Sequence, residues 1–237
     1  MKMLMKAALA AAFAAVCAAA PAAEANSAAP ITPDGIRAQL EKMPAGNAER
    51  GRKVHEANFC SSCHGAAGVA PTENWPTVSG QPEYVTKKAL IEFRGGFRKG
   101  DHMDELMTAA AKKLSDADIA DLAAFYASQP GAPAATAELP APELVTKGDT
   151  KRMIAPCAMC HGKDATGSAT GIMPILHGQS ARYHEAALKK YRAGERTGDF
   201  SREMRMIAEQ LTDKEISELA AYYASLPGKD AAKPAKK

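Results

Sequence analysis

Aromatic side chains are scarce in this sequence of 237 residues, which contains six Phe, six Tyr and one Trp. Hydrophobic residues make up 46% of the chain, but many of them are alanine, whose side chain is small. A large core of aromatic rings is therefore excluded. Small domains built from this sequence would need another apolar group to fill their interiors.

Neither sign of charge is in excess, since 30 Lys and Arg residues stand against 27 Asp and Glu residues and the formal net charge is +3. The basic residues are spread among acidic ones and form no stripe, so nucleic acid is excluded as a partner. Beyond the N-terminal segment, the sequence also lacks an apolar run long enough to cross a membrane.

The N-terminal segment has the pattern of a secretory signal peptide. Lys2 and Lys6 precede an apolar run at residues 7–20, and residues 23–25 form an A-x-A cleavage site. We predict that cleavage removes this segment, Cys17 included, and that the mature protein is exported to a periplasm. The alternatives are an uncleaved anchor and a lipoprotein attached at Cys17.

The rest of the sequence is an internal repeat. Cys60 and Cys157 lie 97 residues apart, and so do Tyr126 and Tyr223. The middle blocks of the two copies match at an offset of 98, so the second copy has one extra residue after its cysteine pair. A repeat of this length predicts two domains with the same fold.

The predicted organisation has six segments: a signal peptide (1–25), an N-terminal extension (26–46), a first domain (47–130), a Pro/Ala-rich linker (131–143), a second domain (144–228) and a basic tail (229–237). The linker should be extended. The extension and the tail should be poorly ordered.

Each domain is predicted to be all-helical. Ser115–Asp118 and Thr212–Glu215 have capping-box or near capping-box spacing, and apolar residues follow each at i, i+3, i+4 and i+7. A second helix is predicted at residues 82–94 and 181–192, and a short one before each cysteine pair. Because no run of alternating strand residues occurs, the fold class is all-α with two tandem domains.

The motifs CSSCH, at residues 60–64, and CAMCH, at residues 157–161, carry the chemistry. A CxxCH motif in an exported chain is typical of covalent haem c attachment, in which both thiols bind the porphyrin and the histidine lies below the iron. We predict two covalently bound haem c groups, with thioether bonds and proximal iron ligands from Cys60, Cys63 and His64, and from Cys157, Cys160 and His161.

Other uses of paired cysteines fit less well. Zinc sites join two CxxC pairs that lie about 15 to 20 residues apart, far closer than the two pairs of this chain. A thioredoxin-like redox pair requires a βαβ context, which the sequence does not have. Structural disulfides occur in exported proteins, but they would not require a histidine after each pair.

The sixth iron ligand decides the function of such a site. An open iron face reacts with peroxide, oxygen or nitric oxide, whereas a methionine ligand makes an electron carrier. Met107 and Met204 each lie eight residues before an equivalent helix cap, whereas Met103 and Met206 have no methionine counterpart in the other copy. We therefore predict Met107 and Met204 as the ligands; core packing is the alternative for any single methionine.

Two further pairs recur in both copies. Pro76 and Pro174 could each offer a carbonyl to the proximal histidine, or could simply form a turn. Arg98 and Arg196 occupy equivalent loop positions, where they could meet haem propionates or be solvated. Histidines that do not recur are predicted at the surface: His55, His102, His177 and His184.

Taken together, these motifs resemble class I cytochrome c. Each copy has CxxCH, then P-x-x-x-G-Q, a G-x-R loop, a Met eight residues before the helix cap and a final A-x-[FY]-Y-A-S helix. Two such units in one exported chain, over residues 47–228, resemble the dihaem cytochrome c4 family. The resemblance implies two helical domains about a pseudo-two-fold axis and His–Met ligation of both irons. The sequence around Met204 departs from the family by lacking an Asp-Pro or Met-Met run.

The resemblance also implies a function. Such a protein is a periplasmic one-electron carrier at each haem, not an enzyme, loosely associated with the membrane. It takes electrons from a respiratory donor and passes them to a terminal oxidase or reductase. The alternatives are a tightly bound electron-transfer subunit of a dehydrogenase or oxidase complex, and a dihaem peroxidase. A peroxidase needs one haem with an open distal side, against which both methionines argue.

Haem would supply the apolar interior that the sequence lacks, so the haem-free protein is expected to be largely unfolded. Protein produced without haem attachment should show no cooperative thermal transition in its circular dichroism, whereas the haem-loaded protein should melt cooperatively. A cooperative, native-like transition in haem-free protein would contradict this prediction.

Overall fold

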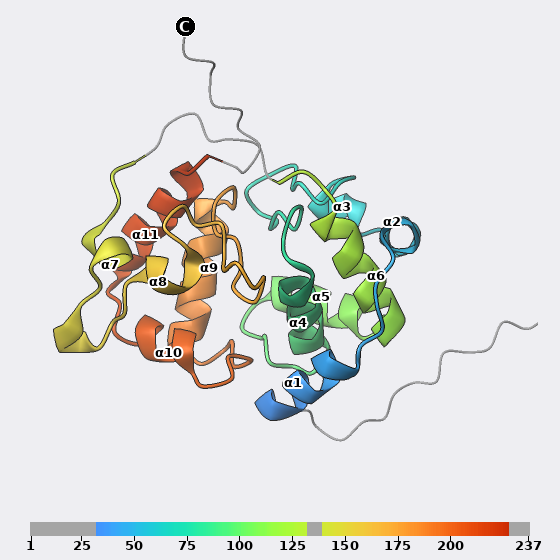
Figure 1. The fold of residues 1–237 in the computed structure, drawn as a ribbon, viewed down its shortest axis with the longest axis horizontal. Coiled ribbons are helices and arrows are strands. Elements are labelled where there is room, and N and C mark those ends of the chain that lie inside the picture. Colours follow the sequence, from blue (N-terminus) through green and yellow to red (C-terminus); the bar gives the residue numbers. More distant parts are fainter. Residues whose placement is uncertain (1–31, 132–138, 228–237) are drawn as a thin grey trace, which may run out of the picture.

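The computed structural model describes residues 32–131 and 139–227. The predicted signal peptide, the first residues of the extension, most of the linker and the basic tail lie outside the described residues. Two lobes of helices lie side by side, the first in blue to green and the second in yellow to red (Figure 1). This confirms the predicted all-α class with two tandem domains.

The first lobe contains α1 (Pro33–Lys42), α2 (Ala48–Ala57), α3 (Ser61–His64), α4 (Glu83–Arg94), α5 (His102–Ala111) and α6 (Asp116–Ala127). The second contains α7 (Glu143–Thr146), the 3₁₀ helix η1 (Thr150–Arg152), α8 (Cys157–His161), α9 (Ala181–Arg192), α10 (Glu203–Ala208) and α11 (Asp213–Ser225). Extended pairing among the described residues is limited to two isolated bridges. In the first lobe α6 packs against α2 and α4, and in the second α9 packs against α11 and α10.

Local sequence accounts for the last helix of each lobe. The Ser115 hydroxyl accepts a hydrogen bond from the Asp118 N–H, and the Asp118 carboxylate accepts one from the Ser115 N–H. Thr212 and Glu215 make the same reciprocal pair. Both predicted capping boxes are therefore confirmed. Each satisfies two N–H groups that the helix itself leaves unpaired.

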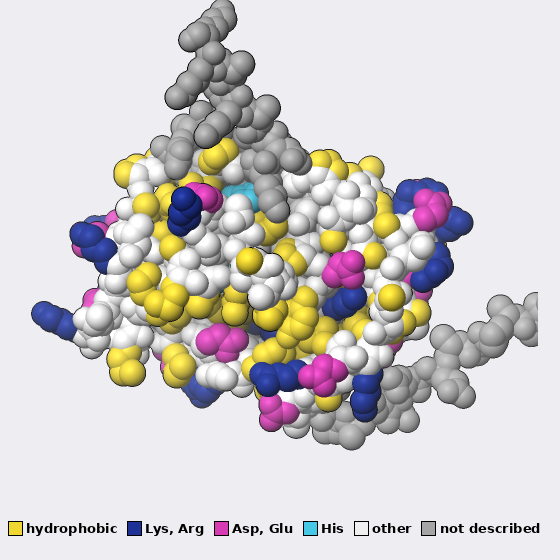
Figure 2. Space-filling view, in the orientation of Figure 1, with side chains coloured by type: hydrophobic (Ala, Val, Ile, Leu, Met, Phe, Trp, Pro, Cys, Tyr) yellow, Lys and Arg dark blue, Asp and Glu magenta, His cyan; other side chains and the backbone are white. Residues whose placement is uncertain are grey.

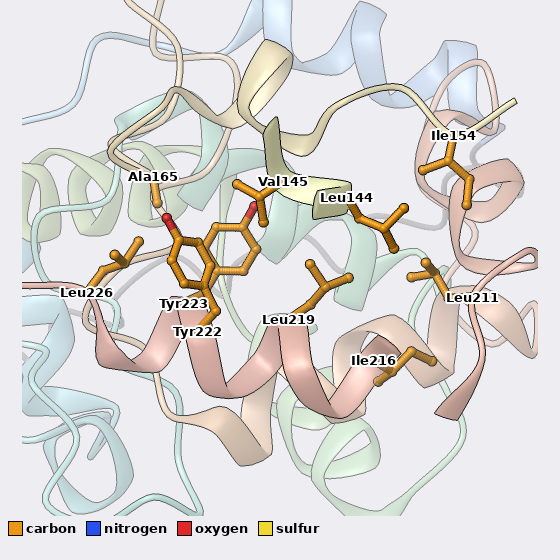
Figure 3. Close-up of a cluster of buried hydrophobic side chains, with 10 residues drawn as sticks. All are labelled: Leu144, Val145, Ile154, Ala165, Leu211, Ile216, Leu219, Tyr222, Tyr223 and Leu226. Carbon is orange, nitrogen blue, oxygen red and sulfur yellow. The ribbon is translucent and has the colours of Figure 1, made fainter. Parts of the chain in front are cut away.

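Each lobe has its own small core. In the first, Ile119, Leu122 and Phe125 of α6 form a buried cluster. In the second, α11 turns Leu219, Tyr222 and Tyr223 toward Leu144 and Val145 of α7 (Figure 3). Hydrophobic side chains also form a band across the middle of one face, and most charged side chains lie toward its edge (Figure 2).

The described part of the N-terminal extension is folded, so the prediction of poor order is wrong for residues 32–46. Helix α1 begins with Thr32 as its N-cap and Pro33 in its first turn, and it packs against α4. The side chain of Ile36 is fully buried. The cap and the proline were readable signals, but only the contact with α4 explains why so short a helix is stable.

The two lobes meet along a seam, which we define by the loop residues 76–81 and 97–101 of the first lobe and their copies in the second. Arg98 and its copy Arg196 form an antiparallel bridge. Two backbone hydrogen bonds flank it, from Thr197 N–H to Phe97 O (2.8 Å) and from Lys99 N–H to Glu195 O (3.0 Å). Donor and acceptor positions exchange between the copies, so the lobes are related by a local pseudo-two-fold axis.

Opposite charges meet across the seam. The fully buried Glu92 binds Arg98 at 2.6 Å, lies 3.8 Å from Arg196 of the other lobe, and also pairs with Lys88. Burial alone would raise the pKa of Glu92, but the three cations outweigh it and lower the pKa to about 2. The copy of Glu92 is Lys190, and across the seam it contacts two carboxylates of the first lobe, those of Asp101 (2.8 Å) and Asp104 (2.6 Å).

None of the helices in the described ranges is long and apolar enough to span a bilayer.

Close approach of α2 to α6 depends on Gly51. A methyl group there would overlap the carbonyl group of Asp121 and the Cβ of Phe125. We expect Gly51→Ala to lower the free energy of unfolding of the haem-loaded protein by about 1–3 kcal/mol, because the crossing is already closely packed. Lys53→Ala, on the exposed face of the same helix, should change it by about 0.5 kcal/mol or less. Denaturant titration measures both; equal effects would show that the crossing tolerates a methyl group.

Candidate functional site: two cysteine–histidine turns

Each CxxCH motif forms a single helical turn that ends at its histidine. In the first lobe, His64 N–H donates to Cys60 O at 2.9 Å, and Gly65 ends the turn with φ of 74°. In the second lobe, α8 covers the motif and Gly162 ends it with φ of 80°. Only glycine adopts this backbone conformation without strain. The turn therefore places two thiols and one imidazole on a short, rigid segment.

Both histidines are buried and oriented by a backbone carbonyl. His64 and His161 are each 8% exposed. The Nδ1 atom of His64 lies 2.8 Å from Pro76 O, and that of His161 lies 3.3 Å from Pro174 O. Because a carbonyl only accepts, Nδ1 carries the proton, and Nε2 keeps its lone pair for a metal. This confirms the prediction that both proline carbonyls accept a hydrogen bond from the histidine, and the prolines do more than form a turn.

Burial also fixes the charge of these rings. It lowers the pKa of His64 and of His161, although the hydrogen bond to the proline carbonyl raises each pKa in part. The imidazoles are therefore neutral at neutral pH, which is the form that binds metal. The donor set fits haem iron, which takes a neutral proximal imidazole.

The cysteines do not have the properties of a redox pair. Burial raises the pKa of Cys60 and of Cys157. Catalytic and redox thiols have a lowered pKa, because the thiolate is the reactive species. Among the described residues there is also no cluster of three or more His, Cys, Asp or Glu side chains placed to hold a metal ion. Neither the redox nor the zinc interpretation is supported.

Each methionine predicted as a ligand is less exposed than the neighbouring methionine in the same lobe. Met107, in α5, and Met204, in α10, are half-buried. Met103 is 37% exposed and Met206 is 55% exposed. Helices α5 and α10 pack against the equivalent helices α4 and α9. The geometry agrees with the order in which the repeat ranks the methionines, and their role as iron ligands stays a prediction.

The recurring arginines lie in the seam. Arg98 is 8% exposed and stacks on Phe93, and Arg196 stacks on Tyr191. Solvation at the surface is therefore the wrong alternative. The Nε atom of Arg196 is buried and has no hydrogen-bond acceptor among the described residues. This Nε–H group can donate a hydrogen bond to a carboxylate, and a haem propionate is a carboxylate of that kind.

Three of the four remaining histidines are buried, which corrects the prediction that all lie at the surface. His55 is 1% exposed, with Nδ1 at 2.9 Å from the Tyr126 hydroxyl, and His184 and His177 are also buried. Only His102 is exposed. The repeat gave the wrong answer here, because a histidine can be buried without a histidine at the equivalent position of the other copy.

Two segments of the chain, residues 48–129 and 147–227, each match the family model for cytochrome c. Together they make up more than half of the sequence. A curated relative, cytochrome c4 of Pseudomonas aeruginosa, is 34% identical over 190 residues, which cover 77% of this chain and 90% of the relative. The chain belongs to the cytochrome c4 family. Another relative is the thiosulfate dehydrogenase electron acceptor of Thiomonas intermedia, 34% identical over 179 residues that cover 73% of this chain and 80% of the relative.

Solved structures agree with this assignment. The crystal structure of reduced cytochrome c4 from Pseudomonas stutzeri has a TM-score of 0.66 at 30% identity, covering 77% of this chain and all of the other. The thiosulfate dehydrogenase TsdBA of Marichromatium purpuratum has a TM-score of 0.65 at 30% identity, covering 76% of this chain and 40% of the other. As a member of the cytochrome c4 family with two cytochrome c domains, the protein carries two covalently bound haem c groups and is a dihaem electron carrier.

The methionine assignment has a matched test within each lobe. In Met107→Ala and in Met204→Ala, the red absorption band of methionine-to-iron ligation should fall by about half, because one of two ligands is lost. Met103→Ala and Met206→Ala are the controls and should leave the band unchanged. Absorption spectra of the oxidised holoprotein measure all four variants. An undiminished band in Met107→Ala or in Met204→Ala would remove that methionine from the ligand set.

Proposed function

We propose that the protein is a periplasmic electron carrier of a respiratory chain, that it holds one electron at each haem, and that it catalyses no bond-making or bond-breaking reaction. The observation that carries the proposal is the pair of buried, carbonyl-oriented histidines, each on a CxxCH turn. Each haem, when bound, supplies one-electron Fe(III)/Fe(II) chemistry.

The residues of the chain have three tasks in this proposal. Cys60, Cys63, Cys157 and Cys160 hold the haems by thioether bonds. His64 and His161 would offer Nε2, and Met107 and Met204 their sulfur atoms, as ligands of the irons. Burial of the histidines excludes water and fixes ring orientation, which limits structural change when the charge on iron changes. A site closed by methionine favours electron transfer over peroxide chemistry.

Docking of the lobes along the seam suggests why one chain contains two domains. Backbone pairing and buried charge pairs dock the lobes in one geometry. A fixed geometry keeps the two haem sites at a constant separation. We infer a two-electron store or a short internal wire, in which one electron enters at one lobe and leaves at the other.

Terminal oxidases or reductases are the acceptors that we propose, with a respiratory donor, export by the predicted signal peptide and peripheral association with the membrane. A second candidate is an electron-accepting subunit of a dehydrogenase. It is favoured by the names of two similar proteins, the Thiomonas thiosulfate dehydrogenase electron acceptor and the Marichromatium thiosulfate dehydrogenase. A dihaem peroxidase is the least favoured candidate.

Stoichiometric titration tests the carrier directly. Oxidised holoprotein should take up two electrons per chain, and the reduced protein should be reoxidised by membranes that contain a terminal oxidase. Turnover of hydrogen peroxide by the reduced protein would contradict the proposal. Copurification with a dehydrogenase catalytic subunit, together with reduction by thiosulfate only in its presence, would favour the second candidate over a free carrier.

A further inference from the structure

One peptide group of the first lobe contacts both its proximal histidine and the other lobe. The carbonyl of Pro76 accepts the hydrogen bond from His64 Nδ1 at 2.8 Å. The N–H of the same peptide group belongs to Thr77 and donates to the side-chain oxygen Oε1 of Gln179 at 2.8 Å. The Gln179 amide Nε2 then donates to Thr77 O at 2.9 Å. Gln179 belongs to the second lobe and is 8% exposed.

The second lobe repeats the arrangement with the roles exchanged. The Pro174 carbonyl faces His161 Nδ1 at 3.3 Å. The N–H of that peptide group, on Ile175, donates to Oε1 of Gln81 at 3.1 Å, and Gln81 Nε2 donates to Ile175 O at 2.8 Å. Gln81 and Gln179 occupy the same position in the two copies. Each lobe therefore clamps the peptide group that orients the histidine of the other lobe.

Hydrogen bonds in such a chain strengthen one another. An acceptor on the N–H side of an amide increases the negative charge on its carbonyl oxygen, so the carbonyl accepts a stronger bond from the imidazole. A stronger bond at Nδ1 makes Nε2 more basic. A more basic axial ligand stabilises Fe(III) relative to Fe(II), so the reduction potential falls.

We propose that Gln179 and Gln81 are positioning residues that act across the seam, each strengthening the histidine-to-proline hydrogen bond of the opposite lobe and lowering the reduction potential of the haem there. This inference rests on the proposed ligation by His64 and His161. The distances in the Gln179 relay, 2.8 and 2.8 Å, are shorter than those in the Gln81 relay, 3.1 and 3.3 Å. Gln179 therefore has the larger effect, and docking of the lobes is linked to the potentials of both haems.

The alternative is a purely structural role, in which the glutamines only hold the lobes together. The two explanations differ in which histidine a substitution affects. A substitution that merely loosens the seam affects both histidines alike, whereas a broken relay affects only the histidine of the opposite lobe. The test therefore needs a separate signal from each histidine.

The experiment uses the full haem-loaded chain with Gln179→Met or Gln81→Met. Methionine has a similar length, but its thioether accepts only weakly from a peptide N–H. A seam cavity of about 200 Å³, lined by both glutamines, leaves room for its shape. Proton–nitrogen NMR of the reduced protein follows the Nδ1–H signals of the two proximal histidines, and potentiometric titration follows the two haems. Gln179→Met should move the His64 signal upfield and raise the potential of the first haem. Gln81→Met should do the same, to a smaller extent, for His161 and the second haem.

Two further variants separate a relay from simple adhesion. Ser180→Ala removes a neighbouring hydrogen bond across the seam, from the Ser180 hydroxyl to Glu73 O (2.9 Å), and the N-cap bond that this hydroxyl accepts from Tyr183 N–H in α9, without touching either proline peptide. It should leave both histidine signals in place. Gln179→Glu keeps an oxygen acceptor for the Thr77 N–H and, while its carboxyl group is protonated, a donor to Thr77 O, so at acidic pH it should restore the His64 signal.

The proposal is overturned if a glutamine variant moves the signal of its own lobe, moves both signals equally, or moves neither. It is also overturned if Ser180→Ala reproduces the effect. Failure of the proposed function has a different signature. In that case the Nδ1–H signals of His64 and His161 in the unsubstituted holoprotein would lack the large shift that a haem ring imposes on an axial ligand.

Discussion

Each proximal histidine donates its Nδ1 proton to a proline carbonyl, and this hydrogen bond constrains both the site and the seam. On one side it fixes the tautomer and orientation of a buried imidazole. On the other side, the peptide group that accepts the proton is itself held by a glutamine of the opposite lobe. A shift of one lobe relative to the other would therefore disturb the orientation of both imidazoles. The site and the contact between the domains form one structure.

The charges of the seam show how a duplicated domain can become specific for its partner. Position 92 is Glu in the first copy, and the equivalent position 190 is Lys in the second. Lys190 lies against Asp101 and Asp104 of the first lobe. If two first lobes paired in the same way, Glu92 would lie against two carboxylates, and the desolvated like charges would repel. Buried ion pairs contribute little net stability. We infer that these charges select one pairing of the lobes rather than strengthen it.

Much of the fold was readable because local signals and the repeat supported each other. The capping boxes at Ser115 and Thr212 fixed where the last helix of each lobe begins, and the apolar period showed which face is buried. The repeat register separated Met107 and Met204 from two nearby methionines, and the half-buried positions of this pair agree with that ranking. The errors arose where the determining contact was not local. Helix α1 is stable because Ile36 is buried in a lobe that packs α1 on α4, and His55 is buried by its contact with Tyr126, which lies 71 residues away in the sequence.

The sequence alone decided which groups meet at each site, because CxxCH brings two thiols and one imidazole together within five consecutive residues, at distances set by covalent geometry. It also determined that this chemistry occurs twice. How the two copies face each other, and which residues of one contact the other, depends on contacts between distant residues that exist only in the folded protein. Glu92, Lys190, Gln81 and Gln179 look like ordinary polar residues in the sequence. Their partners in the other lobe lie roughly 90 to 100 residues away in the sequence. Only packing of the two lobes removes water from between them and gives those contacts their strength.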